Sequence, residues 1–522
     1  MSSRGRQVDQ MNGYWRFLAA ACISLALSVA PPAAEGKTLV YGLPANPESL
    51  DPAKTNHVFS DHVIWHLYDA LTVLTKDAKE MKPALAESWE VGPDGLTYTF
   101  HLRKGVRFHD GTPVNAEAVK ISYERQYLAT SPHYSSDPRN AYESVLKGLI
   151  KDIRVVDPMT VVIALTFPRP QQFAIVKIVS PAAAARSGKG FGRQPVGTGP
   201  FKFLSWKEDV EVVLARNDDY WGGPPRIERL DFRTIPNSDR MIEALMQGQI
   251  HFVPEVDPKY FERIRFSQTT TPHPVIGLNF YYLGFYTDRL PFNDPRLREA
   301  VIRAIDAKRA VQILGRGAAI PAINPLPPGS EGYDPELVQP SYDPARARQL
   351  LREARVPKDL TLTLVYAAPL SFYAELMHSV QDSLRKVGLN VRLREAKTWR
   401  DLVEEAKNGV GEMFFLGFTV STPDPDRFLY PLFHSKEAAQ NNLTRYSNPK
   451  VDELLDKARR PMESAQRLKL YQEAQRLIVA DMPMLFMFHL VKTAGIDGRV
   501  AGLELNLYSF PADKLVGVSL RE

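Results

Sequence analysis

The sequence predicts an α/β protein with two or three lobes, and three observations lead to this fold class. The chain has 522 residues, more than one ordinary domain needs. Hydrophobic residues make up 44% of it, as in globular proteins. Its second half alternates apolar strand patterns with amphipathic helix patterns. This alternation is typical of α/β folds, in which ligands bind at the ends of strands.

The N-terminus has the pattern of a secretory signal peptide. Basic residues, the last of them Arg16, come before an apolar run, 17–30, that is too short to span a bilayer comfortably. Small residues follow, so we expect cleavage after Ala34 and a signal peptide at 1–34. An uncleaved membrane anchor is the alternative. The single cysteine, Cys22, lies inside the apolar run and resembles a lipidation site only weakly, so the exported chain is expected to lack disulfides.

The charge balance excludes one class of partner. The formal net charge is +5, and loss of three Arg and one Asp with residues 1–34 leaves +3. This balance gives no reason to expect nucleic acid binding. No later apolar run is long enough to span a membrane. We therefore expect a soluble, exported, monomeric protein located in the periplasm.

The first elements of the exported chain are a strand at 37–43, a polar loop rich in Pro, and a helix at 61–74. Apolar residues at helical spacing are expected to bury one face of this helix; they are Val63, Leu67, Tyr68 and Leu71.

The segment 92–119 contains a strand and two turns. Residues 96–102 alternate apolar and polar side chains, which predicts a half-buried strand. Asp94-Gly95 supplies a tight turn before it. A second short strand at 106–108 is expected to end at the turn His109-Asp110-Gly111.

The same segment continues into a helix, which Asn115 is expected to cap. His109 and Asp110 are neighbours in a turn and point in different directions, so a catalytic dyad is not favoured. Each special residue of this segment therefore has a structural task.

The middle of the chain predicts further strands and one helix. Gly197 and Gly199 lie in a loop that lacks the Lys-Ser/Thr of a P-loop, so a phosphate site is not expected. The predicted elements are two strands in 154–166, a strand after the loop at 195–206, a strand at 226–235, and a helix at 239–248 that ends at Gly248.

The second half contains capped helices and buried strands. Asp294 and Pro295 mark the start of a helix over 294–314, with an apolar stripe of Leu297, Val301, Ile305 and Val311. The other predicted strands are 359–368, 389–396, 412–420 and 485–491, and the other helices are 371–388, 448–460 and 464–483.

Residues that could carry chemistry are few. His62 and His66 are four apart, with His57 nearby, but Val63 stands where a zincin motif requires Glu. We expect these histidines to be solvated, with a metal contact as the alternative. The sequence contains no GxSxG motif and no cysteine after residue 34. An enzyme, such as a secreted hydrolase, is therefore not favoured.

Several segments together resemble the bacterial extracellular solute-binding proteins of family 5, the receptors of dipeptide, oligopeptide and nickel ABC importers. The resemblance covers nearly all of residues 37–500, in order. Its strongest part is PALAESWEVGPDGLTYTFHLRKGVRFHDGTPVNAEAVKISYER. The other segments are VGTGPFKFLSW, NDDYWGGPPRIERLDFR, LPFNDPRLREAVIRAIDAKRAV, LGRGAAIPAINPLPP, YDPARARQLLREA and YSNPKVDELLDKAR.

The resemblance implies a two-lobed periplasmic-binding-protein (Venus-flytrap) fold with an extra third domain and mixed sheets flanked by helices. Lobe I is expected at 35–78, 196–275 and 496–522, the extra domain at 79–195, and lobe II at 276–495. Two connecting segments then act as hinges. The chain would capture a peptide or peptide-like solute between its lobes and deliver it to an ABC permease in the inner membrane. No catalysis, metal or cofactor is expected.

The resemblance also identifies candidate ligand contacts. The family's peptide receptors carry a D-x-x-D-P loop after the strand that matches 412–420, and its first Asp pairs with the α-ammonium of the peptide. Here Asp424 and Pro425 match, but Ser421 stands at the first position. A hydroxyl cannot neutralise a buried ammonium.

Ser421 and Thr422 therefore favour a polar neutral solute, such as a modified peptide or a sugar. Asp424 could substitute for the missing Asp, although its role in the family is structural. Alternatives of the same receptor fold are an oligosaccharide, an opine-like conjugate or a nickel–chelator complex.

Further candidates are Asn46 and Glu48 in the first loop, Trp399 and Arg400 before a helix, and Tyr282 near a hinge. Trp399 could stack on a ligand, and Arg400 could hold a carboxylate or phosphate. Packing or a solvated surface is the alternative for each. Trp65 is expected to pack in the core beside the first helix.

Overall fold

The computed structural model describes residues 37–134, 140–315, 317–368, 371–420, 422–460, 463–507 and 510–521. The predicted signal peptide, 1–34, lies outside the described residues. Ser421 also lies outside them.

The first elements follow the predicted order with one difference. β1 is Thr38–Leu43 and α1 is Val58–Leu67, but the predicted helix 61–74 ends early. Tyr68 has an extended backbone, and β2, Thr72–Leu74, follows and pairs with β3, Met81–Pro83. All four residues of the predicted apolar face are nonetheless buried; they are Val63, Leu67, Tyr68 and Leu71.

Two glycines explain why α1 ends at Leu67. The backbone N–H of Gly199 donates to the Leu67 carbonyl oxygen at 3.0 Å. A Cβ atom on Gly197 would lie 2.1 Å from that same oxygen, and one on Gly199 would lie 2.4 Å from the His66 oxygen. Backbone approaches this close admit only glycine. The two glycines therefore serve the close packing of this segment against the end of α1.

We predict that Gly197→Ala lowers the free energy of unfolding by about 2–3 kcal/mol, because the new methyl group must displace backbone. Gly190→Ala is the control, since nothing lies within 4 Å of a Cβ atom there. Equilibrium unfolding in urea measures both. Equal stabilities for the two variants would contradict this account of the close approach.

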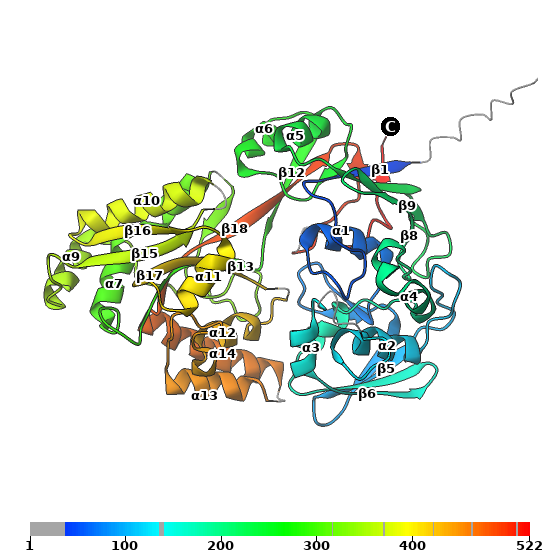
Figure 1. Cartoon of the computed structure of the whole chain (residues 1–522), viewed down its shortest axis with the longest axis horizontal. Coiled ribbons are helices and arrows are strands. Elements are labelled where there is room, and N and C mark those ends of the chain that lie inside the picture. Colours follow the sequence, from blue (N-terminus) through cyan, green and yellow to red (C-terminus); the bar gives the residue numbers. More distant parts are fainter. Residues whose placement is uncertain are drawn as a thin grey trace, which may run out of the picture. The chain divides into compact units, whose positions relative to one another are not determined.

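A four-stranded antiparallel sheet follows, in the order β4-β5-β7-β6. Along β5, Tyr98, Phe100 and Leu102 are buried while their neighbours are half-buried, as the alternation predicts. Its strands are Ala86–Val91, Thr97–Leu102, Ile150–Asp157 and Thr160–Leu165, and the associated helices α2 and α3 are Ala116–Tyr127 and Glu143–Leu149 (Figure 1). The predicted strand at 106–108 is reduced to one bridge between Arg107 and Pro113.

The turn residues of this region have the structural tasks expected of them. The Asn115 side chain accepts a hydrogen bond from the Ala118 N–H and caps α2. His109 Nε2 lies 3.0 Å from the Gly199 oxygen, and burial lowers the pKa of His109 to about 4. Asp110 accepts hydrogen bonds from Thr112 and Ser180. His109 and Asp110 therefore hold loops together and do not form a dyad.

Within the described residues, the largest sheet has twelve strands: ten run in the order β16-β15-β17-β13-β18-β11-β1-β10-β9-β8, and β12 and β14 each pair with β18 beside this path. Its strand bounds not yet given are β8 Phe201–Lys207, β9 Glu211–Arg216, β10 Arg229–Thr234, β11 Phe252–Val253, β12 Thr270–Ile276, β13 Asn279–Phe285, β14 Ala319–Pro321, β15 Thr361–Ala367, β16 Asn390–Ala396, β17 Met413–Thr419 and β18 Met484–Asp497. β18 is its longest strand. β18 pairs with β13 and β14 through its first half and with β12 and β11 through its second.

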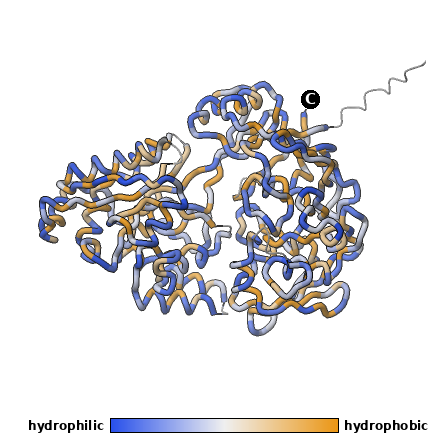
Figure 2. The backbone as a smooth tube through the Cα atoms, viewed as in Figure 1, coloured by the Kyte–Doolittle hydropathy of each residue, from blue (hydrophilic) through white to orange (hydrophobic). Residues whose placement is uncertain are grey.

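The second half of the chain buries both faces of its strands. Along β15, Leu362 and Leu364 belong to one core and Val365 to another. The first core lies under the helices of residues 295–386 and the second under those of residues 399–481. Figure 2 shows orange, hydrophobic stretches along the chain in this part. Strands buried on both sides are typical of α/β folds.

The helices of this part are mostly those predicted. The predicted helix 294–314 is wrong in one respect: it is divided into α7, Pro295–Ala304, and α8, Ala307–Leu314, because Asp306 caps a second helix. The remaining helices are α4 Pro181–Ser187, α5 Ser238–Met246, α6 Phe261–Arg265, α9 Pro344–Glu353, α10 Ser371–Lys386, α11 Trp399–Lys407, α12 Asp426–Phe433, α13 Pro449–Ala458 and α14 Ser464–Asp481, with short 3-10 helices at 170–174, 188–193, 258–260 and 435–437.

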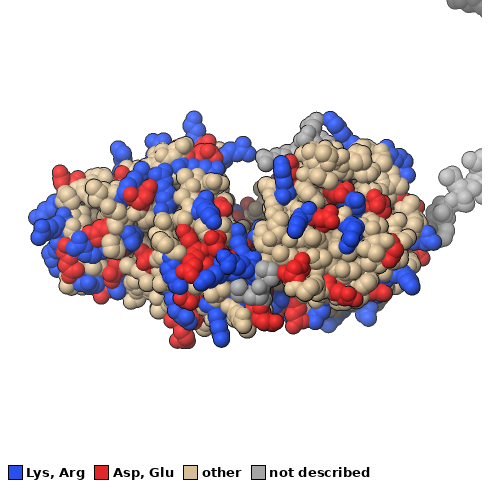
Figure 3. Space-filling view, turned by 90° about the horizontal axis from the view of Figure 1, so that it is seen from below, with Lys and Arg blue, Asp and Glu red and all other residues tan. Residues whose placement is uncertain are grey.

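Two further observations bear on function. No helix among the described ranges has both the length and the apolar character that a membrane span requires. On the face shown in Figure 3, Lys and Arg are intermixed with Asp and Glu. The division into lobe I, extra domain and lobe II at the residues given above stays a prediction.

Candidate ligand-binding site

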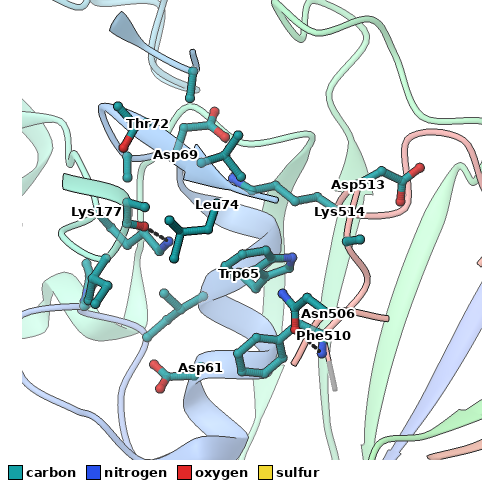
Figure 4. A pocket seen from close by; sticks show the side chains of 18 of the residues that line it. Asp61, Trp65, Asp69, Thr72, Leu74, Lys177, Asn506, Phe510, Asp513 and Lys514 are labelled. Carbon is teal, nitrogen blue, oxygen red and sulfur yellow. Dashed lines mark hydrogen bonds and ion pairs between the residues drawn. The ribbon is translucent and has the colours of Figure 1, made fainter. Parts of the chain in front are cut away.

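A cavity of about 300 Å³ lies where α1, β2 and the C-terminal segment, residues 506–514, come together (Figure 4). Its volume is at the lower end of the usual range for small-molecule pockets, about 300–1,000 Å³. Most of the lining is apolar or aromatic, with charged side chains from three segments. Its lining includes the aromatic side chains of Trp65 and Phe510 and the charged side chains of Asp61, Asp69, Lys177 and Lys514.

One wall of the cavity is aromatic. The rings of Trp65 and Phe510 are stacked, with centroids 5.3 Å apart. Trp65 Nε1 donates a hydrogen bond to the Pro511 carbonyl oxygen at 2.9 Å, which fixes the indole against the C-terminal segment. Trp65 therefore does more than pack beside the first helix, since its ring is only partly buried and faces the cavity.

Asp69 and Lys514 form a buried ion pair at the upper side of the cavity. The Lys514 ammonium contacts the Asp69 carboxylate and donates to the Tyr68 carbonyl oxygen at 2.6 Å. Asp69 also accepts from Thr198, at 3.0 Å, and from Trp221, at 2.9 Å. Burial alone would raise the pKa of Asp69, but Lys514 and these donors lower it below its ordinary value. Both charges are thus satisfied within the protein.

Asp61 and Lys177 also line the cavity, and neither is satisfied in this way. Within the described ranges, no hydrogen bond or ion pair engages the Asp61 carboxylate, and burial raises its pKa to about 7. Lys177 donates to the Ala174 carbonyl oxygen at 3.3 Å and lies over the Trp65 ring at 4.8 Å. Burial, followed by the charge of Lys514, lowers the pKa of Lys177 to about 7.

The prediction that His62 and His66 are solvated is wrong. Both side chains are buried, because α1 packs this face against β1 and the C-terminal segment. Burial lowers the pKa of His66 to about 3 and places that of His62 well below its ordinary value. Among the residues that the structure describes, no group of three or more His, Cys, Asp or Glu side chains is arranged to hold a metal.

None of the ligand contacts predicted from sequence lines this cavity. Asn46 accepts a hydrogen bond from Trp206 Nε1 at 3.0 Å, and Glu48 is exposed. Trp399 is partly buried near Tyr281 and Tyr373, while Arg400 is exposed. These four remain predictions.

Tyr282 has only 2% of its surface exposed and packs against Phe280 and Phe414. This burial favours the packing alternative, and the ligand contact of Tyr282 stays a prediction.

The loop after β17 places Thr422 and Asp424 differently from one another. Thr422 is buried, and its Oγ1 has no hydrogen-bond partner among the residues that the structure describes. Asp424 is engaged by Arg467, whose Nη2 lies 2.8 and 3.0 Å from its two carboxylate oxygens. Asp424 is therefore committed to a structural ion pair and is not free to replace the Asp that Ser421 lacks.

Asp426, two residues on, is the centre of a buried network that sequence reasoning missed. Arg459 donates to both of its oxygens, at 2.7 and 2.9 Å, and Arg169 donates at 2.9 Å from a part of the chain 257 residues away. Burial alone would raise the pKa of Asp426, but Arg459, Arg169 and Arg467 lower it below its ordinary value. The network ties the segment around Arg169 to the start of α12.

Comparison with known proteins agrees with this fold. The model of the bacterial extracellular solute-binding proteins, family 5 (middle), matches residues 80–440. The glutathione-binding protein GsiB of Pectobacterium atrosepticum is 32% identical over 488 residues, covering 90% of this chain and 92% of the relative.

Two solved structures are similar along most of their length. HbpA2 from Haemophilus parasuis aligns with a TM-score of 0.87 and 28% identity, covering 93% of this chain and 100% of the other. The periplasmic binding protein DppA from Helicobacter pylori, in complex with the peptide STSA, aligns with a TM-score of 0.76 and 29% identity, covering 93% and 98%. With two-lobed relatives of this kind, the chain belongs to the bacterial extracellular solute-binding proteins of family 5.

Proposed function

We propose that the chain is the solute-binding component of an ABC importer and that it captures a peptide or peptide-like solute. The observation that carries this proposal is similarity over about nine-tenths of the chain to a glutathione-binding protein, together with the fold shared with a peptide-bound DppA. The first relative is named for glutathione, and the second was solved with the peptide STSA bound.

In this proposal the solute binds between lobe I and lobe II, and its contacts with both lobes favour the closed state. A micromolar solute supplies roughly 8 kcal/mol in all, and part of this free energy drives closure. The cavity beside Trp65 supplies contacts from lobe I and from the extra domain, to which Lys177 belongs. The loop at Ser421 and Thr422, with Trp399 and Arg400, supplies contacts from lobe II.

The rest of the proposed biology follows from this role. Export by the signal peptide places the receptor in the periplasm. The closed, loaded form docks on permease subunits in the inner membrane, and a separate ATPase supplies the energy. The receptor acts as a monomer, catalyses no reaction and binds no nucleic acid.

A second candidate is the same receptor fold for a non-peptide solute, such as an oligosaccharide, an opine-like conjugate or a nickel–chelator complex. The specific observation in its favour is the loop after β17. Ser421 carries no charge, and Asp424 already pairs with Arg467. This loop therefore offers no free carboxylate to the ammonium of an ordinary peptide.

A thermal-shift screen distinguishes the two candidates, because a solute that binds only the native state raises the melting temperature. The panel contains di- and tripeptides, glutathione, oligosaccharides and nickel–histidine complexes. We expect a peptide or peptide-like solute to give the largest shift, about 2.7 kcal/mol of stabilisation at 100 times its Kd. A shift with sugars or nickel complexes alone would favour the second candidate. Substrate turnover without any shift would contradict both.

A further inference from the structure

The proposed function requires partners for the charged groups of the solute, and the cavity beside Trp65 contains candidates for them. A peptide-like solute brings an ammonium and a carboxylate, and each is costly to bury without a charged partner. In the loop after β17, the sequence has an uncharged serine at position 421, and Asp424 already pairs with Arg467. The partners for the two charges must therefore come from elsewhere.

Asp61 is a carboxylate suited to this task. It projects from the first turn of α1 into the cavity, and among the described residues no side chain pairs with it. Asp69, two residues after the end of α1, already accepts hydrogen bonds from Lys514, Thr198 and Trp221. Asp61 is thus a carboxylate of the cavity with hydrogen-bonding capacity left for a ligand.

Lys177 is the corresponding cation. An ammonium has three N–H donors, and the Ala174 carbonyl oxygen at 3.3 Å engages one of them. The Trp65 ring, 4.8 Å from Nζ, offers a cation–π contact but accepts no conventional hydrogen bond. Lys514, which also lines the cavity, forms an ion pair with Asp69. Lys177 therefore retains donors for a carboxylate of the ligand.

The stacked rings of Trp65 and Phe510 supply the apolar contact between these charges, and Figure 4 shows the two rings side by side with Asp61 and Lys177 on the same cavity. We propose that this cavity is a subsite for a zwitterionic ligand group, in which Asp61 binds an ammonium, Lys177 binds a carboxylate, and an apolar stem packs on Trp65 and Phe510. This inference rests on the proposed function. It narrows the solute class to short peptides or amino acid conjugates with both charges free.

Three forms of one probe test the assignment of each charge: the dipeptide Ala-Phe, its N-acetyl form and its C-terminal amide. Titration calorimetry measures each form with the wild type, Asp61→Asn and Lys177→Met. We expect each block to weaken binding to the wild type by at least about tenfold, since a charge-assisted hydrogen bond is lost. Asp61→Asn should be insensitive to acetylation but still sensitive to amidation. Lys177→Met should show the reverse.

Glu331→Gln is the matched control. Burial, followed by the charge of Asp424, raises the pKa of Glu331 to about 7, as for Asp61, but Glu331 does not line the cavity. We expect Glu331→Gln, like the wild type, to bind the dipeptide more weakly after N-acetylation and after C-terminal amidation. Loss of the sensitivity to acetylation in this variant, and not in Asp61→Asn, would overturn the assignment of the ammonium.

Stability separates a binding role from a structural one. Removing an unpaired charge from a poorly solvated position relieves its desolvation cost, so the melting temperatures of unliganded Asp61→Asn and Lys177→Met should equal or exceed that of the wild type. A lower melting temperature, with unchanged sensitivity to both blocks, would overturn the inference and leave the proposed function standing. A wild type that binds nothing in the thermal-shift panel would contradict the proposed function itself, and the inference with it.

Proton exchange on binding gives a second, independent reading. Near pH 7 a bound carboxylate should make Lys177 take up protons, and a bound ammonium should make Asp61 release them. Asp61 and Lys177 act on each other, and the other charged groups around them are Asp69, Asp513 and Lys514, with the neutral phenol of Tyr142 nearby. Calorimetry of Ala-Phe in two buffers should show nearly balanced exchange for the wild type, net release for Lys177→Met and net uptake for Asp61→Asn. The same exchange in all three proteins would overturn the inference.

Discussion

Asp426→Asn is expected to lower the free energy of unfolding by about 3–5 kcal/mol, the cost of breaking a buried ion pair by removing one partner. The variant keeps the volume of the side chain but leaves Arg459 and Arg169 facing an uncharged amide. Arg169 is 8% exposed and Asp426 is 2% exposed, so water cannot readily replace the lost contacts. Equilibrium unfolding in guanidinium chloride at pH 7 measures the loss.

The control and the pH dependence make this prediction specific. Asp382 forms an exposed pair with Arg385 at 3.1 Å, so Asp382→Asn should change stability by less than about 1 kcal/mol. The pKa of Asp426 is lower in the folded state than in the unfolded state, so its stabilisation is complete above the unfolded pKa of about 3.9. It should disappear as the pH falls through the lowered folded pKa. Equal losses for the two variants at pH 7 would contradict the network.

Lys514→Met is expected to cost a similar amount, about 3–5 kcal/mol, because it leaves the Asp69 carboxylate buried without its cation. The two side chains are 11% and 3% exposed, and no other Lys or Arg pairs with Asp69 among the described residues. The substitution also releases the contact between Lys514 and the Tyr68 carbonyl oxygen. We therefore expect the C-terminal segment to exchange its amide hydrogens faster, which hydrogen-exchange mass spectrometry measures alongside the unfolding curve.

Lys76→Met is the matched control for this second prediction. Lys76 also reaches the C-terminal part of the chain, pairing with Glu504 at 3.3 Å, but both side chains are more than 60% exposed. Exposed pairs contribute about 0–1 kcal/mol. If Lys76→Met destabilised the protein as much as Lys514→Met, burial would not be the source of the effect.

The sequence predicts local structure well where the cause is local. The alternation along 97–102 lies on one strand and specifies its buried face, which the structure confirms. Asn115 and Asp294 are helix caps whose hydrogen bonds run to residues within three positions, so a short window contains the whole signal. Asp306 is also a helix cap, within the predicted helix 294–314. The continuous apolar stripe favoured one helix there, so the start of a second helix at Asp306 was missed.

The early end of α1 could not be predicted, because its cause is distant in sequence. Gly197 and Gly199 lie about 130 positions beyond Leu67, and only the fold brings their backbone against it. For the same reason His62 and His66 appeared free to face solvent. The C-terminal segment covers both histidines, and the sequence around α1 contains no signal that predicts this contact.

The candidate site is also assembled from distant segments. Asp61, Lys177 and Phe510 share one cavity, yet no spacing or motif connects them. The resemblance to family 5 identified the loop at Ser421 to Pro425 instead. The ion pair of Asp424 with Arg467 could not be predicted, because the two residues are 43 positions apart. Only the folded chain shows that the partly buried side chains of Asp61 and Lys177 line the same cavity.

Small-angle X-ray scattering tests most directly whether a solute is gripped by two lobes. The purified protein is unfolded in guanidinium chloride and refolded to remove any retained solute, then measured alone and with a saturating amount of the peptide that gives the largest thermal shift. The account predicts a smaller radius of gyration with the peptide, because contacts from both lobes favour the closed state. An unchanged scattering curve at full occupancy, verified by calorimetry on the same sample, would contradict it.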